Sequence, residues 1–193
     1  MKQKKYILVS GCAGFIGMHL CESLLEDGEQ VVGVDNINDY YDINLKNARL
    51  KRLLAFKNFT FYEKDISEWN EVREIFKKHL PVKVINLAAQ AGVRYSLKKP
   101  SEFVTNNILG FYNIIHSAKQ NKIGKIVYAS SSSIYGDSKN FPLQEKQIVN
   151  PKNIYALSKK SNEEISLVYS NYYNTRCVGL RFFTVYGEWG RPD

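Results

Sequence analysis

The 193-residue sequence is poor in cysteine and lacks any long uninterrupted hydrophobic run. Its three cysteines, Cys12, Cys21 and Cys177, form neither a C-x-x-C pair nor a zinc-binding spacing, which argues against a disulfide framework and a structural metal site. No stretch reaches the ~18 apolar residues of a membrane span. We therefore predict a cytoplasmic protein with reduced thiols, no metal and no membrane segment.

A concentrated basic segment is also missing, although the net charge is +8. Apart from Lys2, Lys4 and Lys5 the basic residues are scattered, and no aromatic ladder accompanies them, so we expect no nucleic-acid partner. This basic start imitates a signal peptide, but the spaced glycines that follow and an amphipathic pattern reaching Leu25 argue against one. The length fits a single domain, residues 1–193.

The order of the predicted elements indicates an α/β fold. Short apolar stretches predict strands at residues 5–11, 30–35, 58–65, 82–89, 125–133 and 176–183. Amphipathic stretches predict helices at residues 15–27, 67–80, 100–120 and 153–173, with a loop and a short helix inside 36–56. This alternation predicts a doubly wound parallel sheet, a Rossmann fold of about six strands in the order 3-2-1-4-5-6.

Two of these helices carry more local predictions. Ser67 has the side chain of an N-cap for the helix 67–80. On the last helix, one stripe is formed by Ser161, Ile165, Val168 and Tyr172.

The stretch "LVSGCAGFIG", residues 8–17, spaces three glycines between a predicted strand and a predicted helix. Gly11 permits a tight turn, Gly14 lets the backbone approach a pyrophosphate, and Gly17 lets the helix pack against the strand. Unpaired N–H groups at the start of the helix attract phosphates. Asp35 ends the next strand, where a carboxylate accepts the adenosine ribose hydroxyls and repels a 2′-phosphate. The pattern therefore predicts a dinucleotide site that prefers NAD to NADP.

A second motif, "YALSK", sets Tyr155 and Lys159 four residues apart on one face of the last predicted helix. A lysine charge beside a tyrosine favours the phenolate, which makes the tyrosine a candidate base. Four hydroxyls, Ser130 to Ser133, follow the fifth predicted strand, at the sheet edge where α/β proteins bind ligands. A serine there can orient a substrate hydroxyl toward the tyrosine. No G-x-S-x-G elbow is present, which argues against a serine nucleophile.

With these motifs in place, the chain resembles the extended short-chain dehydrogenases/reductases of the NAD-dependent sugar-nucleotide epimerase/dehydratase family. Within that family it is most similar to the UDP-glucuronate 4-epimerases, through "DNINDYYDINLKNARL", "NLAAQAGVRYSLKKP", "YASSSSIYG", "YALSKKSNE" and "LRFFTVYGEWGRPD". The similarity runs from Lys5 to Asp193. Cys12 stands where the family often has a threonine or another small residue, a mild departure.

The resemblance implies a catalytic triad of Ser131, Tyr155 and Lys159, with Ser132 and Ser133 as near alternatives to the first. It implies NAD contacts at Gly11, Gly14, Phe15, Ile16, Gly17, Asp35, Asn36, Asp65, Ile66, Leu87, Ala88, Ala89, Asn106, Tyr155 and Lys159. Implied contacts to a UDP-sugar are Gln90, Arg94, Ser132, Ser133, Thr184 and Arg191. For Arg94 and Arg191, a surface or intersubunit ion pair is the alternative.

The resemblance also implies a reaction. The tyrosine takes the proton of the sugar 4-hydroxyl while a hydride passes to NAD, and the hydride returns to the other face of a 4-keto sugar. This converts UDP-glucuronate and UDP-galacturonate into each other, commonly for surface polysaccharide. Members often form homodimers through two long helices, here around residues 103–119 and 154–173.

Family members continue past "GRPD" into a region that carries most sugar-nucleotide contacts, so the chain resembles a C-terminally truncated member. We accordingly expect it to bind NAD and to turn over UDP-sugar poorly, because that region excludes water and positions the sugar. A 4,6-dehydratase needs an acid pair where Ser132 and Ser133 stand, which disfavours it. A uronate decarboxylase and a non-catalytic NAD-binding protein are the remaining alternatives.

Overall fold

The computed structural model describes residues 5–190, which form a six-stranded parallel sheet in the order β3-β2-β1-β4-β5-β6. The predicted strand order is confirmed. The strands are β1 (Tyr6–Ser10), β2 (Gln30–Asp35), β3 (Phe59–Glu63), β4 (Lys83–Asn86), β5 (Lys125–Ser131) and β6 (Arg176–Phe182).

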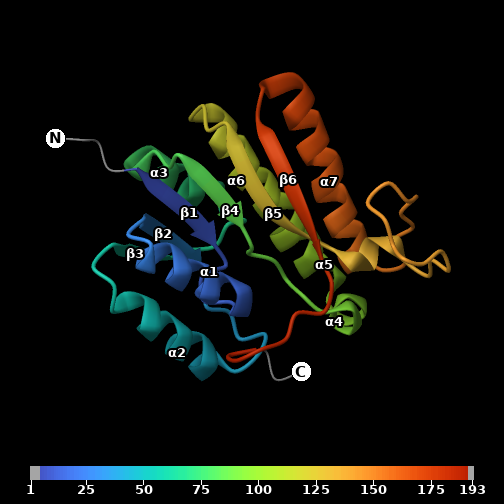
Figure 1. The fold of residues 1–193 in the computed structure, drawn as a ribbon, viewed down its shortest axis with the longest axis horizontal. Coiled ribbons are helices and arrows are strands. Elements are labelled where there is room, and N and C mark those ends of the chain that lie inside the picture. The colour runs from blue at the N-terminus through green and yellow to red at the C-terminus, as the bar shows by residue number, and fades with distance from the viewer. Residues whose placement is uncertain (1–4, 191–193) are drawn as a thin grey trace.

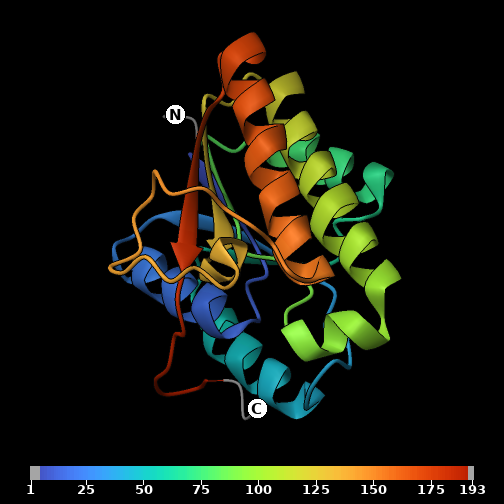
Figure 2. The ribbon, with the colours of Figure 1, turned by 90° about the vertical axis from the view of Figure 1, so that its right-hand side faces the viewer.

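Helices cover both faces of the sheet (Figures 1 and 2). On one side lie α1 (Phe15–Glu26) and α2 (Ile43–Leu54). On the other lie α3 (Trp69–His79), α6 (Gly110–Gln120) and α7 (Ile154–Tyr173). Between β4 and α6 the chain forms α4 (Val93–Lys98), α5 (Pro100–Phe103) and the π-helix η1 (Val104–Leu109), and a 3₁₀ turn η2 (Ser132–Tyr135) follows β5.

Alternating side chains of the strands divide the core in two, as the period of a strand requires. Leu8 of β1 faces the cluster built with Phe76, Phe111 and Ile115 under α3 and α6. Its neighbours on the strand face the opposite cluster, which includes Ile7, Val9, Met18, Cys21, Leu25 and Leu53 under α1 and α2. Because both faces are covered, the central strands read as unbroken apolar runs.

Three local predictions differ from the structure. Helix α3 begins at Trp69 with Glu68 at its N-cap, so Ser67 is not the cap. The Ser67 hydroxyl instead donates to Asp65 Oδ1 at 2.7 Å, which removes it from the helix end. The predicted short helix inside 36–56 is a 12-residue helix, α2. The predicted helix 100–120 is divided into α5, η1 and α6.

The predicted stripe on α7 is only partly buried. Ile165 packs against the core, whereas Val168 and Tyr172 are 49% and 79% exposed. The buried residues of α7 are instead largely polar, namely Ala156, Ser158, Lys159, Asn162, Ser166 and Tyr169. Apolar periodicity therefore identifies the buried face of this helix only in part, because the helix buries hydrogen-bonding groups. Across the described residues, no helix has the length and apolar character needed to cross a membrane.

Candidate functional site

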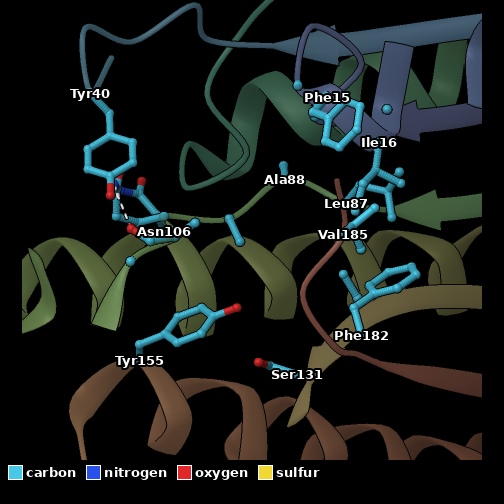
Figure 3. Close-up of a pocket in the computed structure, with 18 of the residues that line it drawn as sticks. Phe15, Ile16, Tyr40, Leu87, Ala88, Asn106, Ser131, Tyr155, Phe182 and Val185 are labelled. Atoms are coloured by element: carbon cyan, nitrogen blue, oxygen red, sulfur yellow. Dashed lines mark hydrogen bonds between the residues drawn. The ribbon is translucent and has the colours of Figure 1, made fainter. Parts of the chain in front are cut away.

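A cavity of about 710 Å³ opens at the carboxyl ends of the strands (Figure 3). Its walls come from the turn after β1, the segments after β2 and β4, the end of β5, the start of α7 and the chain that follows β6. Ligands of doubly wound sheets bind at this edge, where the connections diverge to opposite faces.

The cavity brings together almost all of the predicted site residues. Those that line it are Gly11, Gly14, Phe15, Ile16, Gly17, Asp35, Asn36, Asp65, Ile66, Leu87, Ala88, Ala89, Gln90, Asn106, Ser131, Ser132, Ser133, Tyr155, Lys159 and Thr184. Arg94 lies exposed on α4 and is not among the lining residues. Arg191 lies outside the described residues, so both arginines remain predictions.

The glycine turn at one end leaves no room for side chains. A Cβ atom at Gly17 would lie 2.0 Å from the carbonyl oxygen of Gly11, and one at Gly11 would lie 2.6 Å from the backbone nitrogen of Ala88. Gly11 also has φ +75°, which favours glycine. Helix α1 then starts with Gly14 at its N-cap, so no side chain caps its first N–H groups. Its first turn also holds no acidic residue. Its first N–H groups are therefore available to an anion.

Asp35 lies beside this turn, at the end of β2. Its carboxylate accepts N–H bonds from Ala13 at 3.1 Å and from Ile37 at 3.0 Å, one on each oxygen. Burial raises the pKa of Asp35, and the Ile37 amide, Lys46, the Ala13 amide and Arg49 act in the opposite direction. Each oxygen retains a lone pair, so the carboxylate can accept further bonds from a pair of hydroxyls.

A second acid, Asp65, follows β3 on the same wall. It accepts bonds from the Asn36 amide at 2.8 Å and from Ser67, whose N–H lies 2.8 Å away. Burial would raise the pKa of Asp65, but the bonds from Ser67 and Asn36 lower it. The carboxylate is thus held ionised and fixed in orientation, as a hydrogen-bond acceptor for a ligand requires.

The opposite end of the cavity carries the predicted triad. Figure 3 shows the hydroxyls of Tyr155 and Ser131 turned toward the same space. The Ser131 hydroxyl oxygen accepts the N–H of Ser133 at 3.1 Å, which leaves its own proton to donate. Lys159, one turn after Tyr155, is 3% exposed and donates to the Ala129 carbonyl at 2.9 Å. Burial lowers the pKa of Lys159 to about 8.

Sequence reasoning missed Asn107, which joins three segments behind this triad. Its amide donates to the Gln90 carbonyl at 3.0 Å and to the Ser158 hydroxyl at 2.9 Å, and its oxygen accepts the Gln90 N–H at 2.7 Å. Asn107 lies in the π-helix η1, a type of irregularity that is frequent at functional sites. No spacing in the sequence distinguishes it from the neighbouring Asn106.

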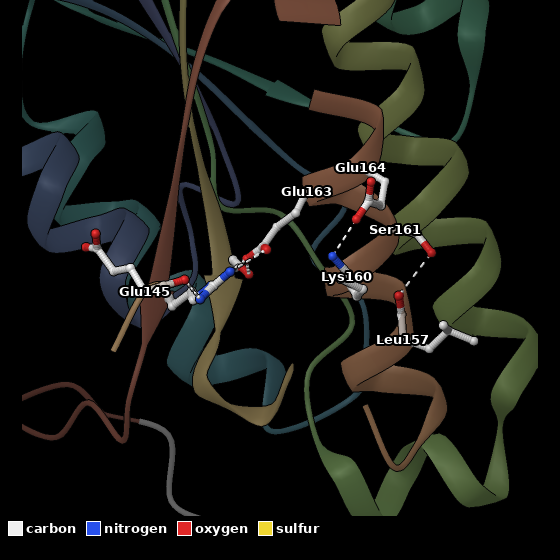
Figure 4. Close-up of polar contacts among 8 residues, drawn as sticks. Glu145, Leu157, Lys160, Ser161, Glu163 and Glu164 are labelled. Carbon is white, nitrogen blue, oxygen red and sulfur yellow. Dashed lines mark hydrogen bonds and ion pairs between the residues drawn. The ribbon is translucent and has the colours of Figure 1, made fainter. Parts of the chain in front are cut away.

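A second unpredicted network, around Glu163, connects α7 to β5 and β6 (Figure 4). Glu163 accepts the Ser130 hydroxyl at 2.6 Å and pairs with Arg181 at 2.9 Å. Arg181 also donates to the Tyr135 hydroxyl and to the Glu145 carbonyl, both at 2.9 Å. Burial would raise the pKa of Glu163, but the bonds from Arg181 and Ser130 lower it. This network fixes the helix of Tyr155 against the strand of Ser131.

The fold and the cavity define a dinucleotide-binding α/β protein with a tyrosine–lysine pair, and the family comparison agrees. The chain belongs to the NAD dependent epimerase/dehydratase family, whose pattern matches residues 7–193. The predicted family and Rossmann fold are confirmed, and NAD is the cofactor of that family.

Individual relatives are more specific. Protein CapI from Staphylococcus aureus is 47% identical over 188 residues, which are 97% of this chain and 56% of that protein. UDP-glucuronate 4-epimerase 4 from Arabidopsis thaliana is 46% identical over 189 residues, 97% of this chain and 43% of that protein. The crystal structure of UDP-glucuronic acid 4-epimerase from Bacillus cereus in complex with UDP-glucuronic acid and NAD matches with a TM-score of 0.91 and 35% identity. The match covers 97% of this chain and 59% of the chain in that crystal structure. The chain thus spans about half the length of these relatives.

Proposed function

We propose that this chain forms the cofactor-binding and proton-transferring part of an NAD-dependent nucleotide-sugar 4-epimerase, which converts UDP-glucuronate and UDP-galacturonate into each other. One observation carries the proposal: a single cavity has a glycine turn with open N–H groups at one end and Tyr155, Lys159 and Ser131 at the other. The similarity to UDP-glucuronate 4-epimerases supports the choice of sugar.

The residues of the cavity fit NAD. At the glycine turn a Cβ on Gly11 or Gly17 would meet backbone atoms, so the main chain is free to approach a diphosphate. Asp35 would accept the hydroxyls of the adenosine ribose, and Asp65 with Asn36 would flank the adenine end. When bound, NAD would take up a hydride from the sugar and return it.

The side chains at the other end would move the proton. Tyr155 would take it from the sugar 4-hydroxyl, and Ser131 would hydrogen-bond the same oxygen. Lys159 in its ammonium form would favour the phenolate, since a positive charge beside Tyr155 favours its negative form. A 4-keto sugar results. After this sugar has rotated in the site, the same tyrosine would return the proton.

Hydroxyl groups near the triad would select the sugar. Ser132, Ser133 and Thr184 line the cavity and would donate to the carboxylate of a uronic acid. Gln90, which is 3% exposed and held by Asn107, would face the sugar nucleotide from the β4 side. Arg94 and Arg191 stay predictions for the remaining contacts.

A homodimer also remains a prediction. Apolar side chains are exposed on both helices that the resemblance assigns to it, among them Val104, Leu109 and Tyr112 on the first and Leu157 and Leu167 on the second. Sedimentation of the purified chain measures this directly. Supply of polysaccharide precursors and a cytoplasmic location rest on the resemblance and on the reduced cysteines alone.

Two measurements test the proposed function. Calorimetric titration with NAD is expected to give one site per chain, and Asp35→Ala is expected to weaken it. Incubation with NAD and UDP-glucuronate is then followed by NMR, with Tyr155→Phe as the control that lacks the proton-transferring hydroxyl. UDP-galacturonate formed only by the unmutated chain supports the epimerase, a pentose product indicates a decarboxylase, and a 6-deoxy-4-keto product indicates a dehydratase. NAD binding without any product is expected of a binding protein and equally of a chain that spans about half the length of its relatives. Absence of NAD binding overturns the proposal.

A further inference from the structure

The chain that follows β6, residues 183–190, returns across the molecule to α1 and α2 (Figure 1). We call it the crossing segment. Phe183, Thr184, Val185, Tyr186, Gly187 and Gly190 from this segment line the cavity. One wall of the catalytic end therefore continues into a segment whose far end lies against the glycine turn.

A single buried arginine of α2 joins the two. Arg49 donates from one nitrogen to the carbonyl of Ala13, in the glycine turn, at 3.3 Å. From its Nε it donates to the carbonyl of Trp189, in the crossing segment, at 3.1 Å, and a second nitrogen of the same group reaches that carbonyl too. A further bond goes to the Tyr41 hydroxyl. The planar fork of a guanidinium suits such bridging between fixed acceptors.

The burial of Arg49 is costly and calls for an explanation. Its side chain is 0% exposed, although it carries a full charge. Its hydrogen bonds all go to neutral oxygens. Among residues 5–190 no carboxylate lies at ion-pair distance, although Arg49 is near enough to Asp35 to oppose the rise in pKa that burial causes in that acid. Burying a cation in this way disfavours folding unless its hydrogen bonds are well formed. An apolar residue at this buried position of α2 would pack without that cost.

The segment that Arg49 holds is strained at the point of contact. Trp189 has φ +62°, a left-handed conformation that a bulky side chain adopts at a cost. Its ring lies under Arg52, 5.3 Å from that guanidinium carbon, and packs against the core under α1 and α2. The preceding carbonyl, of Glu188, contacts His19 at 2.9 Å. Such a conformation persists only where surrounding contacts maintain it.

We infer that Arg49 is a positioning residue that clamps the crossing segment to the glycine turn. Through this clamp, the wall that carries Thr184 and Val185 is set in place by the same turn that receives the diphosphate. Loosening either end loosens the other. The cofactor part of this inference rests on the proposed function, whereas the clamp itself does not.

The tryptophans of the chain allow a direct test. There are two, Trp69 and Trp189, and Trp69 lies on α3 beside His116. In a Trp69→Phe background, emission reports on the crossing segment alone. Arg49→Met removes the bridge, and Arg52→Met is the matched control, because Arg52 stacks on the Trp189 ring but pairs with Glu22 instead of the turn. Circular dichroism confirms that each variant is folded.

In the absence of cofactor, we expect Arg49→Met to shift the emission of Trp189 toward that of a water-exposed indole. Arg52→Met should produce little of this shift. NADH affinity is expected to fall about tenfold in Arg49→Met and less than about twofold in Arg52→Met, as for loss of a charged hydrogen bond. Arg49→Lys keeps the charge but not the fork, so it should not restore either readout. Unchanged emission in Arg49→Met, an equal shift in both variants, or full rescue by lysine would overturn the clamp.

The two proposals fail separately. If the unmutated chain does not bind NADH, the proposed function fails, while the emission of the cofactor-free variants still judges the clamp. If Arg49→Met does not fold, hydrogen exchange on the unmutated chain decides. The hydrogen-bonded amides of Gly11, Ala13 and Gly14 in the turn and of Gly190 in the crossing segment should then lose protection together as urea is raised. Independent loss would overturn the inference.

Discussion

The glycine turn before α1 and the cluster around α7 lie at opposite ends of one cavity, and they use different parts of the chain. At the turn the ligand-facing groups belong to the backbone, and side chains are excluded by contacts as short as 2.0 Å for an added Cβ. At α7 the groups are side chains, and the helix buries Ser158, Lys159 and Asn162 to hold them. The glycine turn depends on the absence of side-chain atoms, whereas the α7 end depends on polar side chains that are buried away from water.

This difference separates two kinds of energetic demand. A backbone site adds little free energy of its own, but it tolerates no added volume. In a buried polar site, each ionised group opposes folding unless it is fully hydrogen-bonded. Adding volume at the turn should therefore only destabilise the fold, whereas removing the buried charge of Lys159 should stabilise it.

Gly17→Ala should have the largest effect. The added Cβ would meet the Gly11 carbonyl and the Cys12 backbone, and neither can move without breaking the turn. We expect a loss of more than about 3 kcal/mol in the free energy of unfolding, beyond the usual cost of overpacking, because backbone atoms would have to move. Urea denaturation measures it. Gly124→Ala, where no atom lies within 4 Å of the new Cβ, is the control and should change little; a stable Gly17→Ala chain would contradict the backbone account.

Glu163→Gln should be next, because it leaves Arg181 partly buried without its counter-ion. We expect a loss of about 3 kcal/mol at pH 7, as when one partner of a buried pair is removed. The pKa of Glu163 is lowered by Arg181 and Ser130, so its contribution is complete above the ordinary glutamate range and is lost as the pH falls. Urea titrations from pH 7 to pH 3 should show a gap that closes on acidification. Glu164→Gln, whose side chain is 57% exposed, is the control.

Lys159→Met should act in the opposite direction. Burial lowers the pKa of Lys159 from 10.5 to about 8, a penalty of about 3 kcal/mol at pH 7. Subtracting about 1 kcal/mol for the lost bond to Ala129 leaves a gain near 2 kcal/mol. Between pH 8 and 10.5 the unfolded chain binds more protons than the folded one, so stability of the lysine form rises with pH and the gain shrinks.

Chemical denaturation at pH 7, 8.5 and 10 measures this trend. Lys160→Met, at the neighbouring partly exposed lysine that pairs with Glu164, is the control and should show no such trend. If Lys159→Met is less stable than the unmutated chain at pH 7, the buried lysine is a structural support, and the contrast between the two ends fails.

The sequence predicted the two ends with unequal success. The sequence predicted the glycine turn and Asp35 because their spacing reflects local backbone geometry, which depends on few distant residues. It also predicted that Tyr155 and Lys159 share one helical face. It did not predict the roles of Asn107, Glu163 and Arg49, because each acquires its role from partners that only the fold brings close.

The buried face of α7 was also predicted only in part, for a related reason. Apolar periodicity identifies a buried face only where burial is apolar. On α7 the exposed side carries Leu157, Leu167 and Val168, while the buried side carries the polar groups of the site. Local rules fail where function places polar residues inside, and such a failure marks the site.

Gly14→Ala should have the smallest effect on stability and is the sharpest test of the comparison. Gly14 has φ −72°, which alanine adopts freely, and the new Cβ would lie 3.1 Å from the Gly11 carbonyl, tight but not prohibitive. Loss of a glycine N-cap adds a few tenths, so we expect a stability change of about 0.5 kcal/mol. NAD affinity should fall about tenfold, because the methyl group lies where the backbone approaches the diphosphate. Calorimetry on the folded variant measures the two effects apart. If stability and NAD affinity both stay unchanged, the turn is not the phosphate site. Ligand binding would then not explain why this end of the cavity is built from backbone groups.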